Sequence, residues 1–168
     1  MLVFMTGMMG SGKTTVAKHL SSLMNLPYDD LDRVIETREG HSIAEIFESH
    51  GEAYFRSRER EVLSEYCRKE EGIYALGGGA LCSSENWELI PEAAYTVWLK
   101  ASVDTLMERL QGDRSRPLLH KDQKTQLRSL TESRSSFYAR ASIHVDTDQN
   151  TPREIAEMLQ THLGATSV

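Results

Sequence analysis

The sequence is poor in cysteine and proline, and it contains no long run of apolar residues. Its two cysteines, Cys67 and Cys82, are too few and too widely separated for a disulfide framework or a metal-ligand cluster, so we expect reduced thiols in a cytoplasmic setting. No stretch of about 18 apolar residues could span a membrane. The first predicted strand begins at Leu2, and we therefore expect no cleavable signal peptide ahead of it.

An excess of basic residues is also missing. The 168 residues include 19 Lys and Arg against 25 Asp and Glu, which gives a formal net charge of −6. Proteins that bind nucleic acid or anionic membranes usually carry a basic excess, so we expect neither partner. The content of 39% hydrophobic and 26% charged residues is typical of a globular protein, and the length favours one domain over residues 1–168. We take a monomer as the default oligomeric state.

What is present is a regular alternation of strand and helix patterns. Strands are predicted at residues 2–6, 27–31, 73–76, 95–99 and 142–146. Helices are predicted at 14–24, from Ser42, at 52–68, 102–110 and 124–140, and from Thr151. Because such alternation places parallel strands between layers of helices, the sequence predicts an α/β fold with a central parallel sheet flanked by helices.

A glycine-rich turn joins the first strand to the first helix. Its residues 7–14, GMMGSGKT, match the phosphate-loop pattern GxxxxGK[ST] at every fixed position. Glycines let backbone N–H groups turn inward around an anion, the lysine Lys13 reaches the β- and γ-phosphates, and the Thr14 hydroxyl is a hard ligand for Mg²⁺. A chance glycine turn is the alternative. The strand and helix around the motif favour binding of a nucleoside triphosphate.

Two carboxylates follow the second predicted strand. If the chain stays extended, Asp30 and Asp32 project from the same side, because side chains alternate along a strand. Ligands of open α/β sheets bind at the carboxyl ends of the strands, so both acids would face the phosphate loop. In the alternative interpretation Asp32 caps a helix that contains Val34 and Ile35, and Asp29 and Asp30 are turn residues.

Two arginines could form a site for a small carboxylate. Arg56 lies on a predicted helix with Glu59 three residues later, able to brace it, and Arg134 lies on another predicted helix. Brought together, two guanidinium groups could make fork-shaped, charge-assisted bonds to one carboxylate. The alternative is that each belongs to a solvated charged surface.

A basic segment separates two of the predicted helices. Residues 109–124 carry five basic and two acidic side chains, a formal charge of +3 in a chain of net −6. Such a segment beside a phosphate loop is typical of a mobile lid, here at about 111–123, that delivers a cation to the transferring phosphoryl group. A solvated loop without a task is the alternative.

Taken together, the motifs resemble those of the shikimate kinase family, within the P-loop proteins related to nucleoside monophosphate kinases. The resemblance covers nearly the whole chain. The motifs are GMMGSGKTT at 7–15, DLD at 30–32, SIAEIF at 42–47, FR at 55–56, GGGA at 77–80, RPLL at 116–119, and Arg134 followed by Tyr138. The resemblance implies a three-layer P-loop kinase fold and ATP-dependent phosphorylation of the 3-hydroxyl of shikimate, on the route to chorismate and the aromatic amino acids.

The resemblance also implies roles on the nucleotide side. Lys13 would be the phosphate clamp, and Thr14 and Asp30 would form the magnesium site, Asp30 through a metal-bound water. Arg116 would approach the phosphates with the lid. The remaining implied ATP contacts are Gly10, Ser11, Gly12, Thr15, Arg109 and Gln149.

On the substrate side, Asp32 would orient the accepting hydroxyl and take its proton. Arg56 and Arg134 would grip the shikimate carboxylate, and the backbone of Gly77, Gly78 and Gly79 would line the ring. The substrate-binding helices would lie at about 32–68. Leu31 stands where the family usually has threonine, and we expect its side chain to point away from both acids.

Two other functions remain open at this stage. A gluconate kinase would share the phosphate loop and lid, but the two arginines together with DLD and GGGA favour shikimate. A regulatory module that binds nucleotide without transferring phosphate would not need the substrate-side residues. Their presence favours an enzyme.

Overall fold

Strands and helices alternate along the chain as the hydrophobic periods predict. The computed structural model describes residues 1–111 and 122–165. The strands are β1 (Leu2–Thr6), β2 (Tyr28–Asp30), β3 (Gly72–Ala75), β4 (Tyr95–Lys100) and β5 (Ile143–Asp146). The helices are α1 (Lys13–Met24), α2 (Leu31–Glu39), α3 (Ile43–Cys67), α4 (Ser84–Trp87), α5 (Val103–Gln111), α6 (Asp122–Tyr138) and α7 (Pro152–Ala165).

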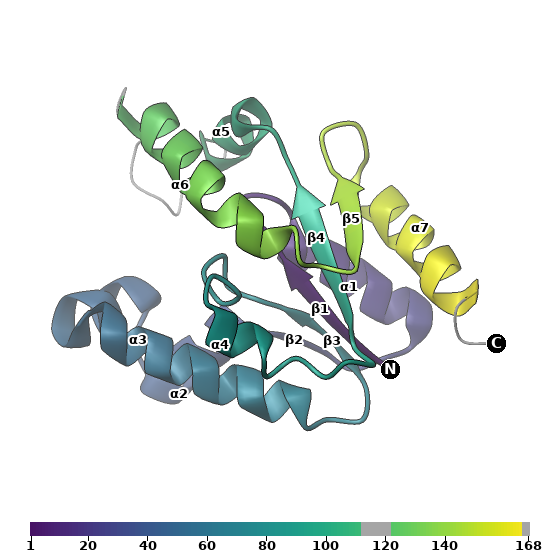
Figure 1. Cartoon of the computed structure of the whole chain (residues 1–168), viewed down its shortest axis with the longest axis horizontal. Coiled ribbons are helices and arrows are strands. Elements are labelled where there is room, and N and C mark those ends of the chain that lie inside the picture. The colour runs from purple at the N-terminus through teal and green to yellow at the C-terminus, as the bar shows by residue number, and fades with distance from the viewer. Residues whose placement is uncertain (112–121, 166–168) are drawn as a thin grey trace.

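The five strands form one parallel sheet in the order β2-β3-β1-β4-β5 (Figure 1). β1 lies in the middle, where Phe4 pairs with Tyr74 of β3 on one side and with Thr96 of β4 on the other. The direction of strand succession therefore reverses at β1. In open α/β sheets such a reversal opens a crevice at the carboxyl ends of the strands, and this is where ligands bind.

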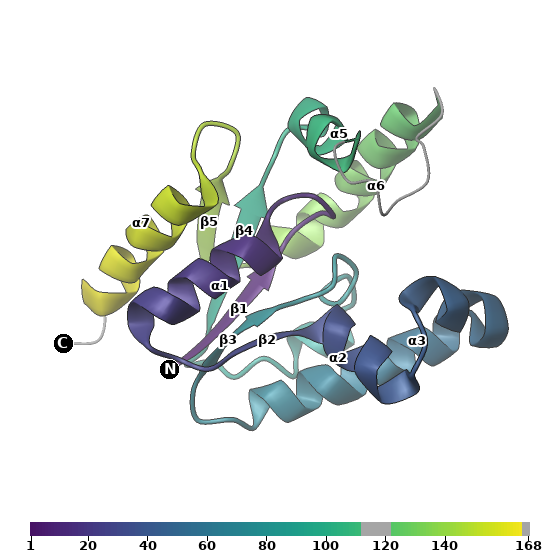
Figure 2. The ribbon, with the colours of Figure 1, turned by 180° about the vertical axis from the view of Figure 1, so that it is seen from behind.

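The central strand shows why the fold has three layers. All five residues of β1 are buried, and alternate side chains enter different cores. Val3 and Met5 pack with residues of α1 and α7, whereas Leu2 and Phe4 pack with residues of α2 and α3. Figures 1 and 2 show these helix pairs on opposite faces of the sheet. The α/β expectation of a parallel sheet flanked by helices is confirmed.

A smaller apolar cluster fixes α5 and α6 over the crevice. Met8 of the phosphate loop packs with Leu106 and Leu110 of α5 and with Leu127 and Tyr138 of α6. This contact brings the helix that carries Arg134 next to a loop more than 100 residues earlier. The predicted lid begins in α5 and ends in α6, but most of it, with Arg116, lies outside the described residues.

The region of about 32–68, where substrate-binding helices are expected, forms α2 and α3. Ser42 and Glu45 form the predicted capping box, in which the Ser42 N–H donates to Glu45 Oε2 at 2.7 Å. Gly51 then takes a positive φ of 80° and divides α3 into the two segments that the periodicity predicts. The four-residue helix α4 is too short for a period and was not predicted. Among the described residues no helix has both the length and the apolar content to cross a membrane.

Candidate active site

The phosphate loop runs from the end of β1 into α1. Gly7 is required there, because a Cβ atom would lie 2.6 Å from the carbonyl oxygen of Leu99. Gly12 precedes α1 with a φ of 95°, and no side chain caps the helix. The first N–H groups of α1 are thus not used by a capping side chain, which is the arrangement that binds phosphate at a helix N-terminus.

Residues of this loop line a cavity of about 310 Å³. Gly10, Gly12, Lys13, Thr14 and Thr15 lie on its wall, as the sequence predicts. The Lys13 ammonium group donates to the carbonyl oxygens of Gly7 and Met8, each at 2.9 Å. A phosphate group that bound Lys13 in this cavity would have to replace these contacts.

Ser11 differs from its neighbours in the loop. Its side chain is 1% exposed and does not line the cavity. Its hydroxyl has no hydrogen-bond partner within the described residues. Its backbone N–H donates to Met8 O at 3.1 Å, so the structure does not bring Ser11 to the cavity wall for the predicted contact with ATP.

Asp30 and Asp32 both line the same cavity, but not for the predicted reason. The extended geometry is wrong: the strand stops at Asp30 and α2 begins at Leu31. Asp30 caps this helix and accepts from the Arg33 N–H at 3.3 Å, while Asp32 lies in the first turn. The alternative interpretation was therefore right that an aspartate caps this helix, but the capping residue is Asp30 and not Asp32. Leu31 is fully buried in the core with α3, as expected for a side chain that points away from the acids.

Thr14 and Asp30 form a pair of hard oxygen groups on the cavity wall. The Thr14 hydroxyl donates to Asp30 Oδ2 at 2.6 Å. Mg²⁺ takes oxygen ligands and commonly uses only one or two protein groups beside phosphate oxygens and water. This donor set, next to Lys13, fits a magnesium ion bound together with a triphosphate.

Arg109 and Gln149 have different outcomes. Arg109 lines the cavity, and its guanidinium group donates to Gly10 O at 3.3 Å, to Thr147 Oγ1 at 3.0 Å and to Thr147 O at 2.8 Å. It therefore ties the phosphate loop to the segment after β5. Gln149 is exposed and lines neither this cavity nor the larger one, so its predicted place beside the adenine stays a prediction.

A second cavity of about 580 Å³ adjoins the first. Arg56 of α3 and Arg134 of α6 both line it, together with Gly79 and Cys82 of the segment after β3. The two predicted carboxylate-binding arginines thus reach one cavity from different helices. For Arg56 the interpretation as a purely solvated side chain is wrong, since it lies on the cavity wall in contact with buried Glu59.

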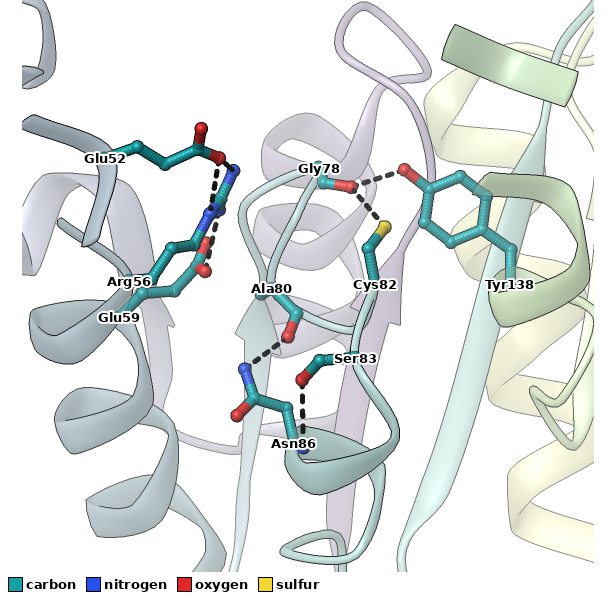
Figure 3. Close-up of polar contacts among 9 residues, drawn as sticks. All are labelled: Glu52, Arg56, Glu59, Gly78, Ala80, Cys82, Ser83, Asn86 and Tyr138. Carbon is teal, nitrogen blue, oxygen red and sulfur yellow. Dashed lines mark hydrogen bonds and ion pairs between the residues drawn. The ribbon is translucent and has the colours of Figure 1, made fainter. Parts of the chain in front are cut away.

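Glu59 was predicted only to brace Arg56, but the structure shows that its side chain is also buried. Its side chain is 1% exposed and accepts from Arg56 Nη1 at 2.8 Å (Figure 3). Burial raises the pKa of the Glu59 carboxyl, the neighbouring Asp32 raises this pKa further, and Arg56 and Arg134 oppose the rise. The sequence singled out Glu59 only by its spacing of three residues from Arg56. It gave no sign of burial, because Glu59 lies inside a run of charged residues of the kind usually found at the surface.

The glycine-rich loop after β3 forms the wall between the cavities. A Cβ atom at Gly77 would lie 2.6 Å from Asp32 Oδ1, and one at Gly79 would lie 2.6 Å from Arg56 Nη1. At Gly78 the distance to Arg134 Nη1 would be 3.4 Å. Each glycine therefore lies against a different predicted substrate residue. Because these glycines have no side chains, Arg56, Arg134 and Asp32 can all approach the same backbone segment.

Comparison with known proteins places this chain in a family. A sequence model of the shikimate kinase family matches residues 9–163. The chain belongs to the shikimate kinase family. The shikimate kinase of Zymomonas mobilis is 42% identical over 158 residues, which cover 94% of this chain and 90% of that protein. The shikimate kinase of Acinetobacter baumannii, solved in complex with shikimate, has a TM-score of 0.88 at 35% identity, covering 97% of this chain and 93% of that one.

The shikimate kinase family, inferred above from dispersed motifs, is therefore confirmed. A gluconokinase from Sinorhizobium meliloti also shares the architecture, with a TM-score of 0.60 over 99% of this chain and 97% of that one. Its sequence identity is only 15%, so this likeness shows the fold alone. The gluconate alternative gains nothing beyond the fold.

Proposed function

We propose that this chain transfers the γ-phosphoryl group of ATP to the 3-hydroxyl of shikimate, a step in the biosynthesis of chorismate and the aromatic amino acids. The main observation in support is the shared wall between the cavities. Gly78 faces the cavity of the phosphate loop, and Gly79 faces the cavity of the two arginines. Substrates on either side of one loop would bring a phosphoryl donor and a hydroxyl acceptor together.

The smaller cavity is proposed to bind the triphosphate. Backbone N–H groups around Gly10 and Gly12 would surround the phosphates, and the Lys13 ammonium would hold the β- and γ-phosphate oxygens. Thr15 and Arg109 lie at the edge of the same cavity. Arg116, outside the described residues, keeps the role that the resemblance implies, as a cation for the transferring phosphoryl group.

We propose that Mg²⁺ binds with ATP, held by the Thr14 hydroxyl and, through water, by Asp30. When bound, the ion neutralises charge on the phosphate oxygens. Among the described residues no group of three or more His, Cys, Asp or Glu could hold a metal by itself. The proposed site therefore depends on the nucleotide for most of its ligands.

The larger cavity is proposed to bind shikimate. Arg56 and Arg134 would hold its carboxylate, and the backbone of the glycine-rich loop would line its ring. Asp32 lies beside Gly77, between the two cavities, and would accept a hydrogen bond from the 3-hydroxyl. The hydroxyl oxygen forms a bond to the γ-phosphorus while the bond from that phosphorus to the β–γ bridging oxygen breaks. ADP leaves with this oxygen, and the hydroxyl proton passes to Asp32.

The test is a coupled ADP-release assay with purified protein, MgATP and a panel of shikimate, quinate, gluconate and nucleoside monophosphates. We expect ADP release that depends on shikimate. Lys13→Met protein purified in the same way controls for contaminating kinases. Absence of shikimate-dependent release from the unmodified chain would overturn the proposal, and gluconate-dependent release would favour the alternative kinase.

We further propose that residues 1–168 act as one kinase domain, as a cytoplasmic monomer, with small molecules as its partners. The net charge of −6 supports the absence of a nucleic-acid partner. Size-exclusion chromatography with light scattering measures the oligomeric state directly, and a dimer mass would contradict this part of the proposal.

A further inference from the structure

Two side chains donate to one carbonyl oxygen in the wall between the cavities. The Tyr138 hydroxyl of α6 donates to Gly78 O, and the Cys82 thiol donates to the same oxygen at 3.5 Å (Figure 3). Tyr138 is fully buried, with an exposed fraction of 0%. A backbone carbonyl held from two directions has little freedom to rotate.

The orientation of this carbonyl determines where the next N–H group points. The described residues contain no cis peptide bond, so Gly78 O and the Gly79 N–H point in opposite directions within their shared peptide plane. Figure 3 shows Gly78 O directed at Tyr138, with Arg56 on the other side of the loop. The Gly79 N–H is therefore directed away from α6 and toward the larger cavity, which Gly79 and Arg56 both line.

Both side chains are suited to act as donors. Burial, followed by the neighbouring Cys82, raises the pKa of the Tyr138 hydroxyl, although Arg134 opposes the rise. Burial is also the largest cause that raises the pKa of the Cys82 thiol. Each group therefore keeps its proton at neutral pH. Tyr138 also follows Arg134 by four residues on α6, one helical turn away.

We propose that Tyr138 is a positioning residue for the acceptor substrate. Together with Cys82 it holds the Gly78–Gly79 peptide so that the Gly79 N–H is presented to the anion bound between Arg56 and Arg134. Helix α6 thus supplies one cation of the cavity and also sets a backbone donor on the opposite wall. The inference rests on the proposed function, because the bound anion is the shikimate carboxylate.

The first test is Tyr138→Phe, which removes only the hydroxyl group. We expect the KM for shikimate to rise about tenfold, the effect of one lost hydrogen bond to a charged group, while the KM for ATP stays within about twofold. Tyr74→Phe is the matched control, because its hydroxyl also donates to a backbone carbonyl, Glu71 O at 3.1 Å, at the opposite end of β3. An unchanged shikimate KM, or an equal rise in both KM values, would overturn the proposal.

A second test uses the other donor and does not depend on Tyr138. Cys82→Ala should raise the shikimate KM a few-fold, and Cys82→Ser should restore it, because serine keeps a donor at this position. The double variant Tyr138→Phe/Cys82→Ala should raise the KM by more than the product of the single effects, since the carbonyl then loses both donors. A double-variant KM equal to the product of the single effects would contradict the proposal that Tyr138 and Cys82 together hold the Gly78 carbonyl. A Cys82→Ser variant with the same KM as Cys82→Ala would also contradict it.

The readouts separate this proposal from the proposed function. Shikimate-dependent ADP release by the unmodified chain tests the function. The ratio of variant to unmodified KM tests the positioning role. Thermal unfolding of every variant, measured without ligands, identifies changes that come from lost stability alone.

Discussion

The two adjoining cavities are built in different ways. The smaller cavity, proposed to bind the triphosphate, draws much of its wall from neighbours in sequence, Gly10, Gly12, Lys13, Thr14 and Thr15. The larger cavity is made of side chains from α3, α4 and α6 and of the glycine-rich loop. Backbone N–H groups suit a phosphate chain of fixed geometry, whereas separate guanidinium groups suit a carboxylate on a particular ring.

The larger cavity also balances its charges internally. Arg56 is paired with Glu52 at 3.3 Å and with buried Glu59 at 2.8 Å. Arg134 has no acidic partner within the described residues. The cavity therefore does not attract anions through a large net charge, and its selectivity depends on where each cation is held. The two cavities should respond differently to the same kind of substitution.

The largest expected effect concerns Asp32, which lines the smaller cavity and lies against Gly77 of the wall between the two. Asp32→Asn should lower kcat by ~10²- to 10⁴-fold, because the acceptor of the hydroxyl proton is lost, while ATP binding stays unchanged. Steady-state kinetics and ATP titration by calorimetry measure the two effects. Asp29→Asn is the control, since Asp29 accepts from the Asp30 N–H at 3.1 Å and lines neither cavity. A near-normal kcat for Asp32→Asn would remove Asp32 from the reaction.

The next effect separates the two cavities through their arginines. Arg134→Ala should weaken shikimate binding by about 2 kcal/mol, or ~30-fold in KM, and leave the KM for ATP unchanged. Arg109→Ala should do the reverse, with a smaller rise in the KM for ATP because Arg109 is exposed. Initial rates with each substrate varied in turn provide the comparison. If both variants shift the same KM, the assignment of one ligand to each cavity is wrong.

The same contrast explains what could be predicted from the sequence. The phosphate-loop residues predicted to contact ATP, with the exception of Ser11, line the smaller cavity, and they could be predicted because the motif occupies consecutive positions. Asp30 and Asp32 were assigned to the correct cavity through the wrong geometry, since DLD is compatible with both a strand end and a helix cap. The assignment of Arg56 and Arg134 to one carboxylate came from the dispersed motifs of the family, because hydrophobic periodicity does not show which helices lie close together.

Other features could not be predicted because they depend on tertiary packing. Glu59 stands in a charged run, and nothing local shows that α3 buries it against the glycine-rich loop. From the sequence, Tyr138 had a place in a motif but no role, because its contact with Gly78 depends on how α6 packs beside the glycine-rich loop. Gln149 was assigned to adenine by resemblance alone, and the structure leaves it exposed and outside both cavities.

A smaller effect on the KM for shikimate should come from a substitution in the glycine-rich loop between the cavities. In Gly79→Ala the new methyl group would lie 2.6 and 2.7 Å from the two terminal nitrogens of Arg56. Because these atoms end a flexible side chain, the protein should fold, but Arg56 must move and the KM for shikimate should rise several-fold. Gly164→Ala adds the same methyl group on α7, where nothing lies within 4 Å, and should leave both KM values unchanged. A rise in the KM for ATP alone would place Gly79 on the nucleotide side.

The smallest effect concerns the dependence of stability on pH, which should have opposite signs for an exposed and a buried carboxylate. In the segment after β5, exposed Asp148 accepts from the Ser102 N–H at 3.0 Å, and this bond lowers the pKa of the Asp148 carboxyl. Its stabilisation is present above the ordinary aspartate pKa of 3.8 and is lost as the pH falls. For Glu59 the pKa is raised by burial, so its contribution is greatest below the ordinary glutamate value of 4.5 and is lost as the pH rises.

Urea unfolding at a series of pH values can separate these two contributions. Asp148→Asn should flatten the rise in unfolding free energy with pH below about 4, since it removes a group that binds its proton more tightly when unfolded. Glu59→Gln should make the dependence above about 4.5 more positive, because it removes a group that holds its proton more tightly when folded. Changes of the same sign in both variants would show that the two carboxylates have similar environments, against the contrast between exposed Asp148 and buried Glu59.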